Sequence, residues 1–201
     1  MISLEKYLEN PCRTLPNPYW KETHFPKPEG LLLLHKDENH VPNGATPYFR
    51  LIQHLSPDMR YPVETPKGFE LREAVLPAQA QLLATMICEC YQYRYTAETV
   101  LSWTKYPVFD SASWLILWDA KSNTPAASAI ADFDPTVGEA ALEWIQVLPE
   151  YQGRGLGQAI VLELLERVKT RAKFVTVSGE VNNPTNPEKL YRKCGFVGDD
   201  I

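Results

Sequence analysis

The feature that most constrains this chain is a glycine at every second position between a strand-like run and a long helical run. The sequence Gln-Gly-Arg-Gly-Leu-Gly at residues 152–157 follows the Val-Leu-Pro step at 147–149, and an amphipathic pattern continues to about residue 172. Glycines let backbone N–H groups converge, and a helix N-terminus adds about half a positive charge. This strand, loop and helix predict a mixed α/β fold with an anion-binding hollow at the loop.

Two well-known phosphate loops do not fit this segment. A Walker A loop ends in Gly-Lys-Ser/Thr, whereas this loop ends in Gly157-Gln158. A dinucleotide-binding loop needs a small residue five positions after its first glycine, and that position is Gln158 or Ile160 here. A nucleotide-binding protein is therefore disfavoured. For the loop taken alone, a glycine-rich connector that merely caps a helix stays the alternative.

Composition narrows the class of protein. The chain has 201 residues, 44% of them hydrophobic, and a net charge of −5, which suits a globular protein and argues against a sequence-independent nucleic-acid binder. There is no apolar run of about 18 residues for a membrane-spanning helix, and no signal peptide is evident. The four cysteines match no zinc spacing and the histidines look unlike a metal set, so we expect a reduced, cytoplasmic protein with free thiols and no metal.

A change of composition near residue 68 predicts two parts. Ten of the 17 prolines lie in residues 1–68, which we interpret as a Pro-rich N-terminal extension that packs on a core of residues 69–201. Because proline fixes φ and removes a hydrogen-bond donor, residues 11–30 and 57–66 should be extended and irregular. Strand-like runs at 30–35 and 48–55 are expected to form a looped hairpin.

The rest of the chain alternates between strand and helix patterns. We predict strands at residues 69–74, 113–118, 126–133, 139–148 and 174–178, and helices at 77–91, 96–103, 155–172 and 187–193.

The loop resembles the acetyl-CoA signature of the GNAT superfamily of acyl-CoA-dependent N-acyltransferases, which reads Gln/Arg-x-x-Gly-x-Gly/Ala after a strand. Downstream, Asn182-Asn183, Leu190-Tyr191 and Gly195-Phe196 look like the family's second motif. The resemblance covers roughly residues 69–196. It implies a mixed, mostly antiparallel twisted sheet flanked by helices. The family normally has one or two strands after Gly-Phe, so here either the chain is incomplete or the sheet edge is completed otherwise, for which the extension offers suitable strands.

The resemblance also assigns roles to residues. Acetyl-CoA, the co-substrate, would be held by the backbones of Val147, Gly153, Arg154, Gly155 and Gly157 and by the side chains of Gln152 and Arg154. Asn183, or alternatively Asn182, would reach the pantetheine arm, and Tyr191 would lie by the thioester sulfur.

Acyl transfer to an amine requires a base, because an alkyl ammonium has a pKa of about 10.4. Glu139 and Glu143 precede the loop, and strand alternation places them on one face with Trp144 on the other. Glu143 lies nearer the thioester and is our candidate catalytic base, with Glu139 left open as the alternative, and Tyr191 is the candidate proton donor to the thiolate. For these residues, solvated carboxylates and a packed aromatic are the structural alternatives. A strand N–H near Val147 or Leu148 would bind the carbonyl oxygen.

The sequence therefore predicts an N-acetyltransferase that moves an acetyl group from acetyl-CoA to a primary amine by direct attack in a ternary complex. The alternative is a catalytically silent acyl-CoA-binding or sensor domain. The acceptor would be a small-molecule or peptide amine, with no nucleic acid or membrane as partner, and a homodimer is left open. Tyrosines and tryptophans in residues 91–106 suit a cationic acceptor or a packed core equally well.

Overall fold

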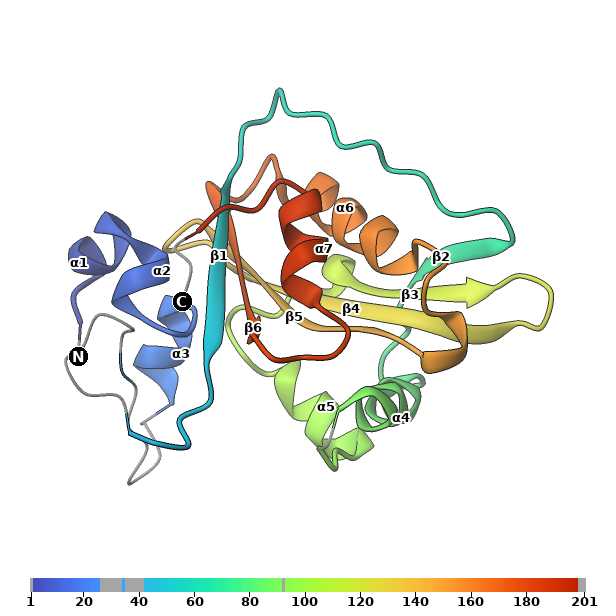
Figure 1. The fold of residues 1–201 in the computed structure, drawn as a ribbon. Coiled ribbons are helices and arrows are strands. Elements are labelled where there is room, and N and C mark those ends of the chain that lie inside the picture. Colours follow the sequence, from blue (N-terminus) through green and yellow to red (C-terminus); the bar gives the residue numbers. More distant parts are fainter. Residues whose placement is uncertain (1, 26–33, 35–41, 92, 199–201) are drawn as a thin grey trace.

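The structure is a computed structural model that describes residues 2–25, 34, 42–91 and 93–198. Six strands form one sheet in the order β1-β6-β5-β4-β3-β2 (Figure 1). The strands are β1 (Tyr48–His54), β2 (Phe69–Glu73), β3 (Trp114–Asp119), β4 (Thr124–Asp134), β5 (Glu139–Val147) and β6 (Phe174–Glu180). Only the β5–β6 pair is parallel. The predicted mixed, mostly antiparallel sheet flanked by helices is confirmed.

Helices cover both faces of the sheet. They are α1 (Leu4–Glu9), α2 (Pro11–Thr14), α3 (Tyr19–His24), α4 (Ala80–Cys90), α5 (Ala97–Trp103), α6 (Leu156–Val168) and α7 (Pro187–Lys193). One apolar core joins α6 and α7 to one face, and a second core joins α4 and α5 to the other. Thr96 caps α5 through its side chain, which accepts a hydrogen bond from the N–H of Thr99.

The sheet splits beside β5. Strands β5 and β6 pair only between residues 139–142 and 174–177. Beyond that point β5 continues along β4 while β6 continues along β1. A bulge in β5 lies here, because Ile130 faces Glu143 but Ser128 faces Gln146. Residues 144 and 145 of β5 therefore lie opposite a single residue of β4, and Trp144 has a φ of 48°. One edge of β5 is therefore left open.

The prediction of irregular chain across residues 11–30 is wrong for its described part, since α2 and α3 lie there. Pro11 occupies the first turn of α2, where no N–H bond is lost, and Asn10 caps that turn. Residues 57–66, by contrast, contain no helix or strand and cross from β1 to β2 at the opposite edge (Figure 1).

Strand β1 joins the sheet next to β6, and Val197 forms a bridge with Ile52 on its other side. The expected strand at 30–35 falls outside the described residues, apart from Leu34, which has no regular structure. The strand at 48–55 is thus an edge partner of β6 over residues 48–54. Strand β1 is therefore the edge strand on this side of the sheet.

Candidate active site

The glycine-rich loop forms a turn whose backbone donors have no side-chain cap. Gly153 and Gly155 have φ values of 76° and 81°, the left-handed region that glycine adopts readily. Gly155 is the N-cap of α6 and supplies no side chain, so the first N–H groups of α6 remain available to an anion. A Cβ at Gly153 or Gly155 would meet no atom within 4 Å, so the space beside both glycines is open. These features fit a diphosphate.

The two polar side chains of the loop are exposed and bind its own backbone. Gln152 Nε2 donates to the Val147 carbonyl at 3.2 Å. Arg154 donates to the Glu150 carbonyl at 3.2 Å, and its guanidinium lies over the Tyr151 ring. Both side chains therefore lie beside the loop, where a phosphate could exchange for these bonds.

Val147 turns its backbone toward the open edge of β5. Leu148 N–H donates to the Ala126 carbonyl, so the adjoining Ala127–Val147 pair is the one without mutual hydrogen bonds. The N–H and C=O of Val147 consequently point away from β4. The Cys90 thiol also lies within 3.6 Å of this carbonyl. Of the two predicted strand donors, Val147 rather than Leu148 can serve a ligand.

Gly157 sets how closely α7 approaches the loop. A Cβ there would lie 3.1 Å from Leu190 Cδ2 and 3.6 Å from Val147 Cγ2. The first turn of α6 therefore packs against both α7 and β5.

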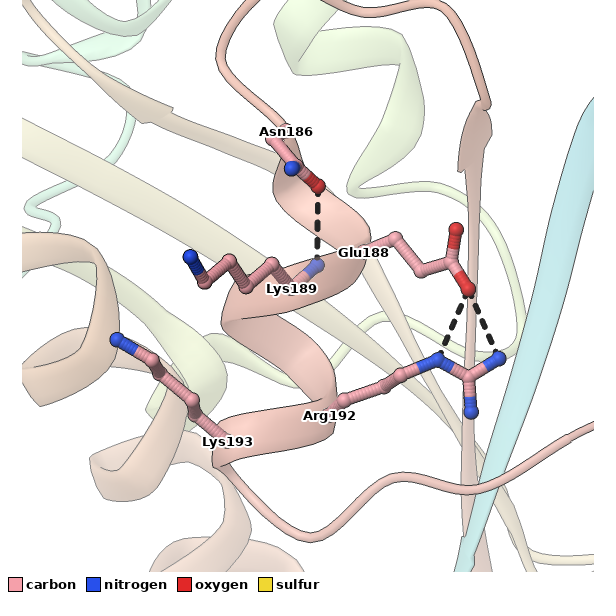
Figure 2. Close-up of a pocket in the computed structure, with 5 residues that line it drawn as sticks. All are labelled: Asn186, Glu188, Lys189, Arg192 and Lys193. Carbon is pink, nitrogen blue, oxygen red and sulfur yellow. Dashed lines mark hydrogen bonds and ion pairs between the residues drawn. The ribbon is translucent and has the colours of Figure 1, made fainter.

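Helix α7 borders a shallow hollow of about 480 Å³ lined by Asn186, Glu188, Lys189, Arg192 and Lys193. Figure 2 shows the Glu188–Arg192 ion pair on one side of α7 and the side chains of Lys189 and Lys193 extending on the other. The hollow is lined by a single element and no carboxylate–aromatic cleft opens into it, so we place the chemistry elsewhere.

The predicted Asn183 and Tyr191 occupy different environments. Asn183 Oδ1 accepts bonds from the N–H and hydroxyl of Thr185, which holds the turn before α7. Tyr191 is only 6% exposed and packs against Phe49 and Phe196. Burial, followed by the nearby Tyr91, Cys194 and Glu143, raises the pKa of the Tyr191 hydroxyl. This hydroxyl stays protonated at neutral pH, as a proton donor must.

Glu139 is a buried anchor. Its side chain is 1% exposed and pairs with Arg50 at 3.1 Å. The hydroxyls of Tyr7 and Thr176 donate to Oε1, and the N–H of Tyr19 donates to Oε2. With both oxygens occupied, Glu139 is unsuited to act as a base.

Glu143 instead faces a cleft. Its carboxylate accepts from Lys21 Nζ of α3 at 2.5 Å and is 21% exposed. Both glutamates face the N-terminal helices, as alternation predicts, but the prediction that Trp144 lies on the opposite face is wrong. The bulge turns Trp144 into the same cleft as Glu143.

This cleft has a volume of about 190 Å³. It is lined by three ionisable residues, Lys21, Asp132 and Glu143, and by aromatic and apolar side chains. The latter are Trp20, Phe25, Tyr95, Trp103, Tyr106, Trp114, Ile130 and Trp144. The Trp103 and Trp144 rings stack, with centroids 5.5 Å apart and an interplanar angle of 2°. The aromatic run of residues 91–106 therefore contributes to both a core and a cleft.

Asp132 is a candidate functional residue that the sequence reasoning missed. Burial, reinforced by Glu143 and opposed by Lys21, raises the pKa of Asp132 to about 8. Its signal was a carboxylate inside an otherwise apolar strand, Ala-Ile-Ala-Asp-Phe at 129–133. A carboxyl group that titrates near neutral pH in a cleft is typical of acid–base sites.

Among the described residues, no helix is long and apolar enough to cross a membrane. Within the same residues, no group of three or more His, Cys, Asp or Glu could hold a metal ion. The four cysteines are free thiols.

A glycine loop at an uncapped helix N-terminus, together with a mostly antiparallel sheet that splits beside β5, defines a mixed α/β protein. The sequence profile of the Acetyltransferase (GNAT) family matches residues 80–196. The chain belongs to this family.

Solved structures agree on the fold. A GCN5-related N-acetyltransferase from Sphaerobacter thermophilus has a TM-score of 0.64 and 21% identity, over 75% of this chain and 47% of that one. The ribosomal-protein-S18-alanine N-acetyltransferase of Escherichia coli has a TM-score of 0.54 and 19% identity, covering 66% and 79% of the two chains. Glucosamine-6-phosphate N-acetyltransferase from Arabidopsis thaliana has a TM-score of 0.51 and 18% identity, covering 69% and 95%.

At these identities the likeness concerns the fold alone, and the chain spans less than half the length of the Sphaerobacter protein. No curated protein matches the chain.

Proposed function

We propose that this chain transfers an acetyl group from acetyl-CoA to a cationic primary amine by direct attack, with both substrates bound together. The observation that carries this proposal is the continuity of the site. The uncapped N-terminus of α6 leads along the open edge of β5 to a cleft that holds two carboxylates, Asp132 and Glu143.

On the cofactor side, the N–H groups of residues 153–157 would bind the pyrophosphate, with Gln152 and Arg154 exchanging their backbone bonds for phosphate oxygens. The Val147 N–H would bind the pantetheine arm or the acyl oxygen. Since Asn183 Oδ1 already holds a turn, its amide nitrogen is the proposed contact to the arm. Acetyl-CoA supplies the activated acyl group.

On the chemical side, Glu143 would accept the proton of the attacking amine and Tyr191 would donate a proton to the leaving thiolate. The two residues belong to opposite faces, since Tyr191 lies in the α6–α7 core and Glu143 in the cleft by α5. Glu143 lies close enough to Tyr191 to contribute to the raised pKa of the tyrosine hydroxyl. The gap between β5 and β6 is where both would reach one group.

The acceptor side favours a cation. Aromatic faces attract ammonium groups, and the Glu143 carboxylate adds negative charge, whereas Asp132, with its pKa raised to about 8, is mostly protonated near pH 7. A volume of about 190 Å³ admits a small amine or the end of a side chain or peptide. We therefore propose a small-molecule or peptide amine as acceptor.

The first test is binding. Acetyl-CoA and CoA should raise the melting temperature, because a ligand that binds only the folded state stabilises it, whereas ATP should give a smaller shift. The second test measures CoA release over a panel of primary amines. Binding without release on any amine would leave a silent acyl-CoA-binding domain, and the absence of any shift at millimolar CoA would refute the proposal.

A variant tests the assigned base. Glu143→Gln should lower the rate most near neutral pH, by roughly 10²–10⁴-fold, and recover partly at high pH, where the amine loses its proton unaided. An unchanged rate at neutral pH would remove Glu143 from the mechanism.

A further inference from the structure

The acceptor cleft already contains a primary amine that belongs to the chain. Lys21 of α3 places its Nζ 2.5 Å from Glu143 Oε1. The same Nζ lies 5.7 Å from the centroid of the Trp20 ring. A carboxylate and an aromatic face are the two surroundings that the cleft offers to an ammonium group.

The position of this amine is fixed by other residues of α3. Trp20 is 4% exposed and packs against Tyr106, with ring centroids 5.3 Å apart. The N–H of Tyr19 donates to the buried Glu139. The Lys21–Glu143 pair itself is partly exposed, with side chains 30% and 21% accessible, and such pairs add little stability. Lys21 is therefore presented to Glu143 by the packing of its neighbours and is not needed to anchor α3.

Lys21 also meets Glu143 at the reactive end of the site. Glu143 is the first residue of β5 beyond its pairing with β6, which ends at Leu142. From there the open edge of β5 runs to Val147 and the glycine loop. An acyl group bound along this edge would end beside the carboxylate that holds the Lys21 amine.

We propose that Lys21 is an intramolecular acetyl acceptor, so that the chain modifies its own N-terminal segment in the acceptor cleft. The inference rests on the proposed acetyl-CoA-dependent function. Glu143 takes a proton from the Lys21 ammonium, and the neutral nitrogen attacks the thioester carbon. The new N–C amide bond forms as the C–S bond breaks, and the second proton lost by the attacking nitrogen balances the one that Tyr191 donates to the leaving thiolate, which gives free CoA.

The product differs from the starting state in charge. Acetyl-Lys21 is neutral and can no longer form an ion pair with Glu143. Glu143 then faces the cleft without the positive charge of Lys21, which leaves the cleft more negative. Self-acetylation would thus prepare the cleft for an external cationic amine.

The experiment uses the full chain and acetyl-CoA alone, followed by peptide mass mapping over time. Lys6 is the internal control, because it lies in the same N-terminal segment, is 62% exposed and pairs with the exposed Glu9. Lys21 should acquire one acetyl group about 10²-fold faster than Lys6, and its first-order rate should not depend on protein concentration. Glu143→Gln should slow Lys21 by about 10²-fold and leave Lys6 unchanged. Lys21→Arg keeps the positive charge and should abolish modification at this position.

Equal rates at Lys21 and Lys6 would overturn the inference, and so would a rate at Lys21 that rises in proportion to protein concentration. Neither result depends on a variant that must fold. Thermal shifts with acetyl-CoA and CoA release on external amines run in parallel. If both succeed while Lys21 stays unmodified, only this inference fails. If acetyl-CoA does not bind, the proposed function and the inference fail together.

Discussion

Replacing Glu139 by glutamine should destabilise the fold strongly, because the change leaves a buried guanidinium without its anion. Arg50 is 6% exposed, and its Nη2 lies 3.1 Å from Glu139 Oε1. Removing one partner of such a buried pair costs about 3–5 kcal/mol. The glutamine keeps an acceptor oxygen for the hydroxyls of Tyr7 and Thr176, which places the expected loss near the lower end, at about 3 kcal/mol.

For a chain of this length, about 1 kcal/mol corresponds to roughly 2–4 °C, so the melting temperature should fall by roughly 6–12 °C. Urea unfolding gives the free energy directly. The matched control is Glu180→Gln on the neighbouring strand, where an exposed carboxylate accepts from the Tyr48 hydroxyl at 3.1 Å. That change should cost less than about 1 kcal/mol.

The double variant Arg50→Met with Glu139→Gln sharpens this test. Its loss of stability should be smaller than the sum of the losses of Arg50→Met and Glu139→Gln alone, since no uncompensated charge remains buried. Equal stabilities of Glu139→Gln and Glu180→Gln would refute the argument. A Glu139→Gln protein of normal stability that had lost its activity would instead make Glu139 the base.

Three further changes test the site. Tyr191→Phe should lower kcat by roughly 10²–10⁴-fold with little change in acetyl-CoA affinity, because the ring still packs against Phe49 and Phe196. Steady-state kinetics and a thermal shift separate the two effects, and an unchanged kcat would exclude Tyr191 as the acid. Gly155→Val should abolish the CoA-induced thermal shift, since φ is 81° at this N-cap and a branched side chain is strained there; a wild-type shift would contradict it. Asp132→Asn should flatten the pH dependence of stability. The pKa of Asp132 is about 8 when folded and about 3.9 when unfolded, so the folded state holds the extra proton between these values and wild-type stability falls as pH rises from about 4 to 8. Urea unfolding at pH 5 and pH 8 measures this difference, and identical slopes for both proteins would contradict it.

Local pattern was sufficient to predict most of the sheet and the loop. The expected strand at 126–133 lies within Thr124–Asp134, and the helix expected at 187–193 matches α7 at both ends. These elements are predicted by the periodicity of apolar residues, by capping residues and by glycines, all of which are close in sequence. The long helix was predicted to reach residue 172 but ends at Val168, because four further residues with helix-like composition turn back toward β6. The division of the chain near residue 68 stays a prediction, although β1 from the first part is an edge strand of the sheet.

Proline content alone does not predict the N-terminal helices, because it argues against helix only where proline would lie inside one. Proline excludes helix interiors but suits their first turns, and both Pro11 and Pro18 occupy such starting positions. The packing that holds these short helices is distant in sequence. Tyr7 and Leu15 join a core with Ile52, Val137 and Phe174. No local pattern reports contacts across more than 100 residues.

The acid–base part of the site depends on such distant contacts even more. Glu139 and Glu143 are the same residue type on one strand and one face, so the sequence alone left both open as bases. Tyr7 and Arg50, 132 and 89 residues away, bury the first carboxylate. Lys21, 122 residues away, contacts the second in a cleft that Trp144, at the bulge, also lines. The N-terminal segment therefore makes Glu139 structural but leaves the Glu143 side chain partly exposed. The contact between Lys21 and Glu143 decides whether the same segment also supplies its own lysine as an acetyl acceptor.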